Sequence, residues 1–153
     1  MTTTRTTTPG MTTTEIDPRG PRTAAWITSA VLAVVLLLPT SAAAVLLAAQ
    51  AIVFGLGARG RSPYGWVFRS LIRPRLGPPT ELEDSRPPQF AQIVGLGFAV
   101  LGVAGFAFGA ALLGQVATAF ALVAALLNAS IGLCLGCEVY LLVTRSTTAR
   151  RAA

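Results

Sequence analysis

The chain has 153 residues, of which 53% are hydrophobic and 12% are charged, and its mean hydropathy of +0.65 is far above that of an ordinary soluble domain. This composition predicts an integral membrane protein with one domain, because the length leaves little room for a separate soluble catalytic domain. The net charge is +6, because twelve arginines outnumber six acidic residues, and the chain has no lysine and no histidine. Since no nucleic-acid-binding motif accompanies the arginines, this charge favours anionic lipid headgroups over nucleic acid as partner.

The N-terminal stretch is rich in threonine and repeats the tetrapeptide Met-Thr-Thr-Thr, first at Met1 and again at Met11. Such a segment has too few apolar side chains to bury a core, so residues 1–16 are expected to be disordered. The repeat also makes Met11 an alternative translation start.

Four segments are long and apolar enough to cross a bilayer, which takes about 20 residues. They lie at about 23–39, 41–58, 89–113 and 115–144. Each is expected to be helical, because backbone groups in lipid find partners only within a helix or a closed barrel, and the alternation of barrel strands is absent. Pro39 and Gly114 mark tight turns within the two pairs. The expected fold is all-α, a polytopic membrane protein with a four-transmembrane-helix bundle over residues 17–145.

The first segment has a second interpretation. Arg19 and Arg22, the apolar run after them and the small residues that follow Pro39 also resemble the three regions of a secretory signal peptide. Removal of such a leader would leave three membrane helices and would reverse the placement of the N-terminus.

The arginines indicate the orientation. They precede the first segment, lie between the second and third, or follow the fourth, and neither tight turn carries one. By the positive-inside rule, both termini and the middle loop are expected in the cytoplasm, with a multi-pass bundle in a bacterial plasma membrane. Residues 146–153 would then form a basic cytoplasmic tail.

The middle loop, at about 59–88, contains its own helix start, because Ser62 suits the N-cap and Pro63 suits the first helical position. The aromatic and basic residues that follow predict a short interfacial helix: Tyr64, Trp66, Phe68, Arg69 and Arg73. Membrane anchoring is the expected role, and docking of a soluble protein is the alternative. An acidic patch further on is interpreted as a solvated loop rather than a cation site: Glu81, Glu83 and Asp84.

Small residues recur along the third and fourth segments, many of them at four-residue spacing: Gly95, Gly97, Gly102, Gly105, Gly109, Ala117, Ala121, Ala125 and Ala129. Small side chains let helix backbones approach closely, so these two helices are expected to pack as a tight antiparallel pair. The contact would lie within one subunit or partly between the subunits of a homo-oligomer.

Both cysteines of the chain lie in the fourth segment, within the sequence Cys134-Leu135-Gly136-Cys137-Glu138. On one continuous helix, both thiols and the carboxylate would share a face in the cytoplasmic half of the membrane. A charged side chain costs about 2.5 to 3.5 kcal/mol at the bilayer centre, so Glu138 is expected to have a function or a partner. The candidate partners are an arginine of the middle loop, Gln50, Gln92 and Asn128.

Two thiols at this spacing can cycle with a disulfide, and exchange requires a thiolate. Glu138 is a candidate proton acceptor for whichever of Cys134 and Cys137 attacks, and the other would be the resolving thiol. Packing of both cysteines as small buried residues is the alternative. Two thiols and one carboxylate are too few for a zinc site within one chain, so no metal and no cofactor is predicted.

Several motifs between Ile16 and Leu142 resemble those of a known family. They are Asp17-Pro18-Arg19, Arg61-Ser62-Pro63-Tyr64, Arg73-Pro74-Arg75-Leu76-Gly77-Pro78, Glu81 to Pro88 with Phe90-Ala91-Gln92, and Asn128 to Tyr140. In these motifs the chain resembles the bacterial, mainly actinobacterial, integral membrane proteins described as domain of unknown function 4395. The resemblance implies a four-helix membrane protein whose genes often neighbour thioredoxin-like or sulfurtransferase proteins, and it implies no established activity.

The leading hypothesis is a membrane thiol-redox or sulfur-relay component that uses Cys134 and Cys137 with a cytoplasmic thioredoxin-like or sulfurtransferase partner. Quinone-linked four-helix thiol oxidoreductases suggest a second hypothesis, but the predicted cytoplasmic placement and the lack of a second cysteine pair count against it. The alternative class is a non-enzymatic scaffold or small-solute carrier, in which the cysteines only pack and Glu138 lines a path or pairs with an arginine.

Overall fold

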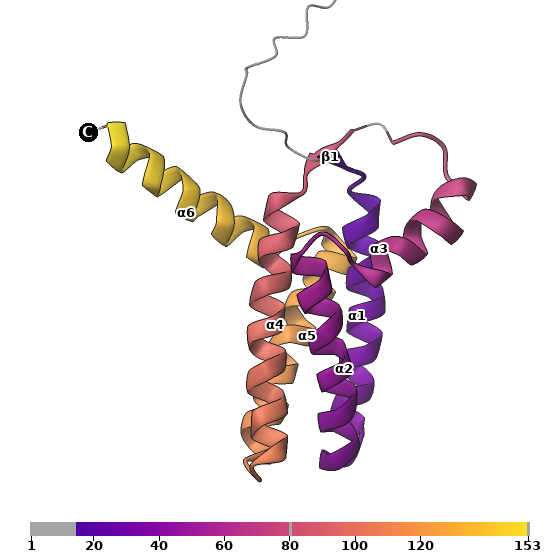
Figure 1. Ribbon diagram of the computed structural model, residues 1–153, viewed down its shortest axis with the longest axis vertical. Coiled ribbons are helices and arrows are strands. Elements are labelled where there is room, and N and C mark those ends of the chain that lie inside the picture. Colours follow the sequence, from indigo (N-terminus) through magenta and orange to yellow (C-terminus); the bar gives the residue numbers. More distant parts are fainter. Residues whose placement is uncertain (1–14, 80, 153) are drawn as a thin grey trace, which may run out of the picture.

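The computed structural model describes residues 15–79 and 81–152, with side chains described as far as Thr147. Four long helices form its body: α1 (Arg19–Leu37), α2 (Thr40–Ala58), α4 (Arg86–Ala107) and α5 (Ala111–Ile131) (Figure 1). Each is long and apolar enough to cross a membrane, with mean hydropathies from 1.5 to 2.0. The protein is a multi-pass membrane protein, and the predicted all-α four-helix bundle is confirmed.

The four long helices pack in a closed ring. α2 packs against α4, α4 against α5, α5 against α1, and α1 against α2. One cluster of buried apolar side chains fills the centre, in which Leu32, Val35 and Leu47 have no exposed surface. Because two of these three come from α1, the first helix is a full member of the core.

The turn between α4 and α5 comes earlier than the sequence predicts. α4 ends at Ala107, and Gly109 adopts a φ of +81°, which glycine tolerates without strain. Gly114 lies within α5, where the two backbones meet, since a Cβ atom on Gly105 would lie 2.5 Å from the Gly114 nitrogen. The predicted segment 89–113 is therefore wrong at its C-terminal end, and the close antiparallel pair forms within one chain.

The predicted fourth segment, 115–144, is wrong, because the structure has two helices there. α5 ends at Ile131, and Gly132 follows with a φ of +76°, the left-handed conformation that ends many helices. α6 (Leu135–Ala152) then leaves the bundle at an angle (Figure 1). The predicted C-terminal tail belongs to this helix as far as Ala152, and α6 is not one of the four candidate spans.

The middle loop begins with the expected helix. At the N-cap of α3 (Pro63–Val67), the Ser62 hydroxyl accepts the Gly65 N–H at 3.2 Å. A π-helical turn, η1 (Phe68–Ile72), and a 3₁₀ turn, η2 (Arg73–Arg75), continue the segment. Its exposed side chains include Trp66 and Leu71, which is the arrangement that an interfacial helix requires.

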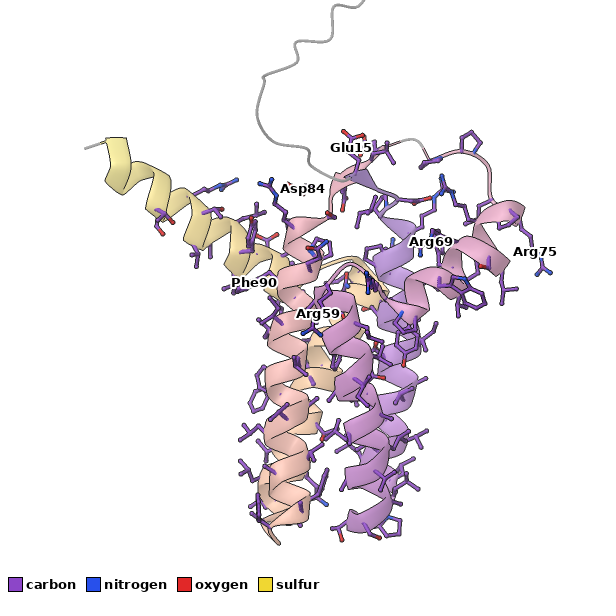
Figure 2. The ribbon with its side chains drawn as sticks, viewed as in Figure 1. Glu15, Arg59, Arg69, Arg75, Asp84 and Phe90 are labelled. Carbon is purple, nitrogen blue, oxygen red and sulfur yellow. A yellow bond between two sulfur atoms is a disulfide. The ribbon has the colours of Figure 1, made fainter. Side chains whose placement is uncertain are left out.

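Charged side chains gather at one end of the bundle, which we call the charged end. α1 and α4 begin there, and α2 and α5 end there. Figure 2 shows the labelled charged residues at this end: Glu15, Arg59, Arg69, Arg75 and Asp84. The two turns at the opposite end, residues 38–39 and 108–110, contain no charged residue. The uneven distribution of charged residues along the sequence therefore places them at one end of the bundle.

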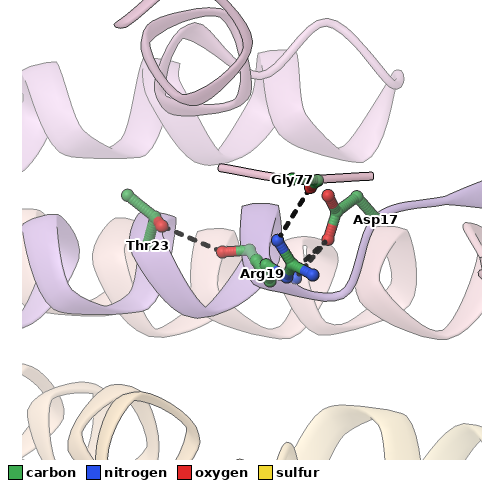
Figure 3. A network of polar contacts seen from close by, with 4 residues as sticks. All are labelled: Asp17, Arg19, Thr23 and Gly77. Atoms are coloured by element: carbon green, nitrogen blue, oxygen red, sulfur yellow. Dashed lines mark hydrogen bonds and ion pairs between the residues drawn. The ribbon is translucent and has the colours of Figure 1, made fainter. Parts of the chain in front are cut away.

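A two-stranded sheet and a polar network tie the elements of the charged end together. β1 (Glu15–Ile16) pairs antiparallel with β2 (Glu83–Asp84). The Asp17 carboxylate accepts the Arg19 N–H at 3.0 Å, and the Arg19 guanidinium donates to the Gly77 carbonyl at 3.3 Å (Figure 3). The disorder predicted for residues 1–16 is thus wrong for the last two, which form β1, and residues 1–14 lie outside the described residues.

The acidic patch of the middle loop has a structural role. Glu83 and Asp84 form β2, and the Asp84 carboxylate accepts the Arg86 N–H at 3.0 Å. This hydrogen bond satisfies a backbone donor in the first turn of α4. The patch thus helps to set the start of α4, the helix against which α6 packs.

Candidate functional site

The two cysteines lie at the break between α5 and α6. Cys134 immediately precedes Leu135, the first residue of α6, and Cys137 lies in the first turn. The two form a disulfide with a Cα to Cα distance of 5.2 Å. The prediction of a pair within one continuous helix is wrong, but the two thiols do meet, because one helical turn separates them.

The start of α6 directs one backbone donor at a sulfur atom and another at the Cys134 carbonyl. The Cys137 N–H points to the Cys134 Sγ at 3.3 Å, and the Glu138 N–H donates to the Cys134 carbonyl at 3.0 Å. Cys134 therefore occupies the capping position of a helix N-terminus, where the positive end of the helix dipole favours negative charge.

Close packing against α4 fixes the first turns of α6. A Cβ atom on Gly136 would lie 2.6 Å from the Ala91 Cα, so α6 touches the α4 backbone at this glycine. One turn later, the Phe90 and Tyr140 rings pack with their centroids 5.7 Å apart. Two glycines thus determine the path of the chain at the disulfide: Gly132 precedes Cys134, and Gly136 lies between the two cysteines.

A cleft of about 850 Å³ opens beside the disulfide. Its walls come mainly from α1, α4, α5 and the first turns of α6, with contributions from β2 and from Phe54 of α2, and both cysteines line it. Polar residues lie among its lining: Arg22, Glu83, Asp84, Gln92, Asn128 and Glu138. The other lining residues are mostly apolar. The site is therefore a disulfide at the edge of an amphipathic cleft.

Arg22 connects α1 to the end of α5. Its guanidinium donates to the carbonyls of Ala129 at 3.4 Å and Ser130 at 3.2 Å. A cation at a helix C-terminus is favourable, because it satisfies carbonyls that lack partners within the helix. The contact spans more than a hundred residues of sequence, so sequence reasoning missed Arg22 as a site residue.

The environment of Glu138 differs from the one that the sequence predicts. Glu138 is exposed on α6 rather than embedded in a membrane-spanning helix, and among the described residues its carboxylate has no hydrogen bond or ion pair. It lines the cleft together with Gln92 and Asn128, two of the predicted partners, without a hydrogen bond to either. Gln50, the third amide proposed as a partner, lies outside this lining.

Gln50 belongs to a separate buried pair. It is only 2% exposed, and its Oε1 accepts the Tyr64 hydroxyl at 2.6 Å, which joins α2 to α3. Burial raises the pKa of Tyr64 above its ordinary value, and the hydrogen bond to Gln50 opposes this in part. The pair positions the middle loop and does not touch the disulfide.

Comparison with known proteins adds a family and no activity. A family model with the description "Domain of unknown function (DUF4395)" matches residues 16–145. No curated protein and no solved structure matches the chain.

Proposed function

Because the chain belongs to the DUF4395 family, whose description names no activity, we propose a function from the site itself: thiol–disulfide exchange at the membrane. The single observation that carries the proposal is the disulfide at the N-terminus of α6, with Cys134 in the capping position and the Cys137 N–H directed at its sulfur. A pair that only filled a helix interface would not need a backbone donor directed at one sulfur.

In the proposed reaction, a thiolate of the partner attacks one sulfur of the Cys134–Cys137 disulfide. A mixed disulfide forms, and the other cysteine leaves as a thiolate. The second thiol of the partner then attacks the mixed disulfide, so that the partner becomes oxidised and the pair is reduced by two electrons and two protons. In the reverse direction Cys134 is the attacking thiolate and Cys137 the resolving thiol. Glu138 lies one residue beyond Cys137 and serves as proton acceptor at the mouth of the cleft.

The proposed partner is a soluble cytoplasmic protein with a thioredoxin-like dithiol or a sulfurtransferase that carries sulfane sulfur. The site lies at the charged end, and the positive-inside rule assigns that end to the cytoplasm of a plasma-membrane protein. The arginines of the middle loop then meet anionic headgroups, and the exposed mouth of the cleft faces the partner.

A trapping experiment tests the exchange. Purified Cys137→Ser protein retains Cys134 and is incubated with a thioredoxin activated as a mixed disulfide with an aromatic thiol. We expect a covalent adduct, visible as a mass shift that dithiothreitol reverses, and a much slower adduct with Cys134→Ser, the matched variant. Exclusive reaction of the Cys134→Ser variant would reverse the assigned roles of the two thiols.

The scaffold or carrier hypothesis makes the opposite prediction. If the cysteines only pack, both thiols of the reduced protein should resist a maleimide until the chain is unfolded, and neither variant should form an adduct. Glu138→Gln adds a second measurement. Loss of the proton acceptor should slow adduct formation at a pH where the carboxyl is ionised and the thiol is still protonated, and should have no effect where the thiol is already ionised, whereas a packing role predicts no pH-dependent change.

A further inference from the structure

The cleft beside the disulfide continues into the membrane-spanning part of the bundle. Along α5 its lining runs from Asn128 to Phe120, which is about 12 Å at a rise of 1.5 Å per residue. Along α4 it runs from Pro87 to Phe98, which is about 16 Å. Both stretches belong to helices that are long and apolar enough to cross a membrane. The cleft thus leads from the disulfide toward the depth of the acyl chains.

The inner part of the cleft is apolar and partly open at its side. The Phe98 and Phe120 rings stack with their centroids 6.4 Å apart, across the contact between α4 and α5. Phe120 is 63% exposed and Val94 is 37% exposed, although both line the cleft. In a bilayer these exposed surfaces face lipid. An apolar molecule dissolved in the membrane therefore has lateral access to the cleft.

The part of the cleft near the disulfide offers hydrogen-bond donors. Gln92 and Asn128 line the cleft, and neither side chain has a hydrogen-bond partner in the part of the chain that the structure describes. The Gln92 amide lies against Gly57 of α2, so it must turn toward the cleft to donate to a ligand there. The Arg22 guanidinium lines the cleft as well and uses only one of its nitrogens for the carbonyls of α5. Three carboxylates line the cleft as well, those of Glu83, Asp84 and Glu138. The two amides and the guanidinium are therefore the side chains of this lining that can donate to the carbonyl oxygens of a ligand.

We propose that the cleft binds a quinone, whose ring lies near the Cys134–Cys137 pair and whose apolar tail extends between α4 and α5. Three observations select this class: an apolar passage within the membrane-spanning helices, amide and guanidinium donors near its mouth, and a two-electron redox pair beside them. The volume of about 850 Å³ falls within the range of about 300 to 1,000 Å³ that is common for small-molecule sites. The inference rests on the proposed thiol exchange.

The electron balance is that of a two-electron transfer. The reduced pair loses two electrons and two protons, and the S–S bond forms. The two carbonyl oxygens of the quinone each gain one proton and become the hydroxyls of a quinol. A soluble dithiol protein then reduces the new disulfide directly, so the path needs no second cysteine pair within this chain. Electrons would pass from the cytoplasmic partner, through the pair, into the membrane.

The first experiment measures the transfer on the intact protein. The purified chain is reduced, freed of reductant without oxygen and mixed with an equal amount of decylubiquinone, whose fully substituted ring does not readily add thiols. We expect one quinone to be reduced for each disulfide formed. The absorbance of the quinone measures the first quantity, and the mass shift of maleimide-trapped thiols measures the second. The Cys134→Ser variant should reduce none.

A second experiment tests the location with matched substitutions. Ala124→Leu and Ala125→Leu each add bulk to the α5 wall of the cleft, whereas Ala107→Leu adds the same bulk at an exposed position at the end of α4. We expect both cleft variants to weaken decylubiquinone binding to the oxidised protein about tenfold or more, as for other pockets that lose room for a few carbon atoms. Ala107→Leu should bind as the unchanged protein does.

The outcomes separate this inference from the proposed function. If thioredoxin adducts form but decylubiquinone is neither bound nor reduced, the quinone site is wrong and thiol exchange stands. If the two cleft variants reduce the quinone as fast as the unchanged protein does, the electrons leave by another route and the site is again wrong. A tightly held phospholipid that decylubiquinone cannot displace would identify the occupant as a lipid and would also overturn the inference. Unreactive cysteines in both experiments would remove both proposals.

Discussion

At the scale of single residues, Gln50 is an unusual side chain for the centre of a membrane-spanning helix. Its amide is almost fully buried, and its Nε2 has no hydrogen-bond partner within the described residues. An unsatisfied buried donor is costly, and the strong hydrogen bond from the Tyr64 hydroxyl to Oε1 offsets part of this cost. This hydrogen bond joins α3 to α2, while α3 and η1 also pack against α1.

Tyr64→Phe should lower the free energy of unfolding by about 1 to 3 kcal/mol, because it leaves the Gln50 oxygen buried without a donor. The effect depends on pH. Burial raises the pKa of Tyr64, so the folded state favours the neutral hydroxyl. This contribution is fully present below about pH 10, the ordinary tyrosine value, and is lost as the pH rises through the raised pKa.

Unfolding of the purified protein in detergent, followed at neutral and at strongly alkaline pH, measures both effects. The matched control is Tyr140→Phe, because the Tyr140 hydroxyl has no hydrogen-bond partner among the residues that the structure describes. Equal stability of the two variants at neutral pH would show that the Gln50 contact contributes nothing.

At the scale of elements, the four long helices were accessible from the sequence, and the helix break at the site was not. A run of about 20 apolar residues is a strong signal on its own. Gly132 is one glycine in an apolar stretch, and nothing local distinguishes it from Gly97, which lies within α4. The difference arises from packing: Arg22 binds the last carbonyls of α5, and Gly136 lets α6 turn onto α4.

Within the site, the cysteine pair follows from local sequence, whereas its surroundings depend on packing. The pair Cys134 and Cys137 was visible because three-residue spacing brings two thiols within reach on a single turn. The position of the pair at a helix N-terminus depends on the break, and the cleft depends on α1 packing beside α4, α5 and α6, which lie far from it in the sequence. Local patterns carry neither kind of information.

Gly132→Ala tests the break. An alanine at a φ of +76° should cost about 1 to 2 kcal/mol, because its Cβ crowds the carbonyl oxygen in the left-handed conformation. Gly97→Ala is the control, since a Cβ atom there meets nothing within 4 Å and the position is helical, so it should stabilise by about 0.5 to 1 kcal/mol. The free energy of unfolding of both variants checks the prediction. A stability for Gly132→Ala equal to that of the unchanged protein would mean that α5 and α6 can join without strain.

At the scale of the whole molecule, the fold separates two kinds of surface. The charged end carries the strand pair, the middle loop, α6 and the disulfide, whereas the opposite end consists of two tight, uncharged turns. With so little chain at the uncharged end, a soluble partner has almost nothing to bind there. The side of the membrane that the charged end faces therefore decides which compartment can supply the partner.

The positive-inside rule predicts that the charged end faces the cytoplasm. Two exposed serines allow a matched test in a chain whose native cysteines are replaced: Ser41 at the uncharged end and Ser70 in η1 near the charged end. In whole cells, a membrane-impermeant maleimide should label Ser41→Cys and spare Ser70→Cys, and in inverted vesicles the pattern should reverse. The opposite pattern would place the disulfide outside the cytoplasm, where an oxidising environment would keep it formed. An external thiol protein would then replace the cytoplasmic partner, while the path from the disulfide into the membrane would remain as described.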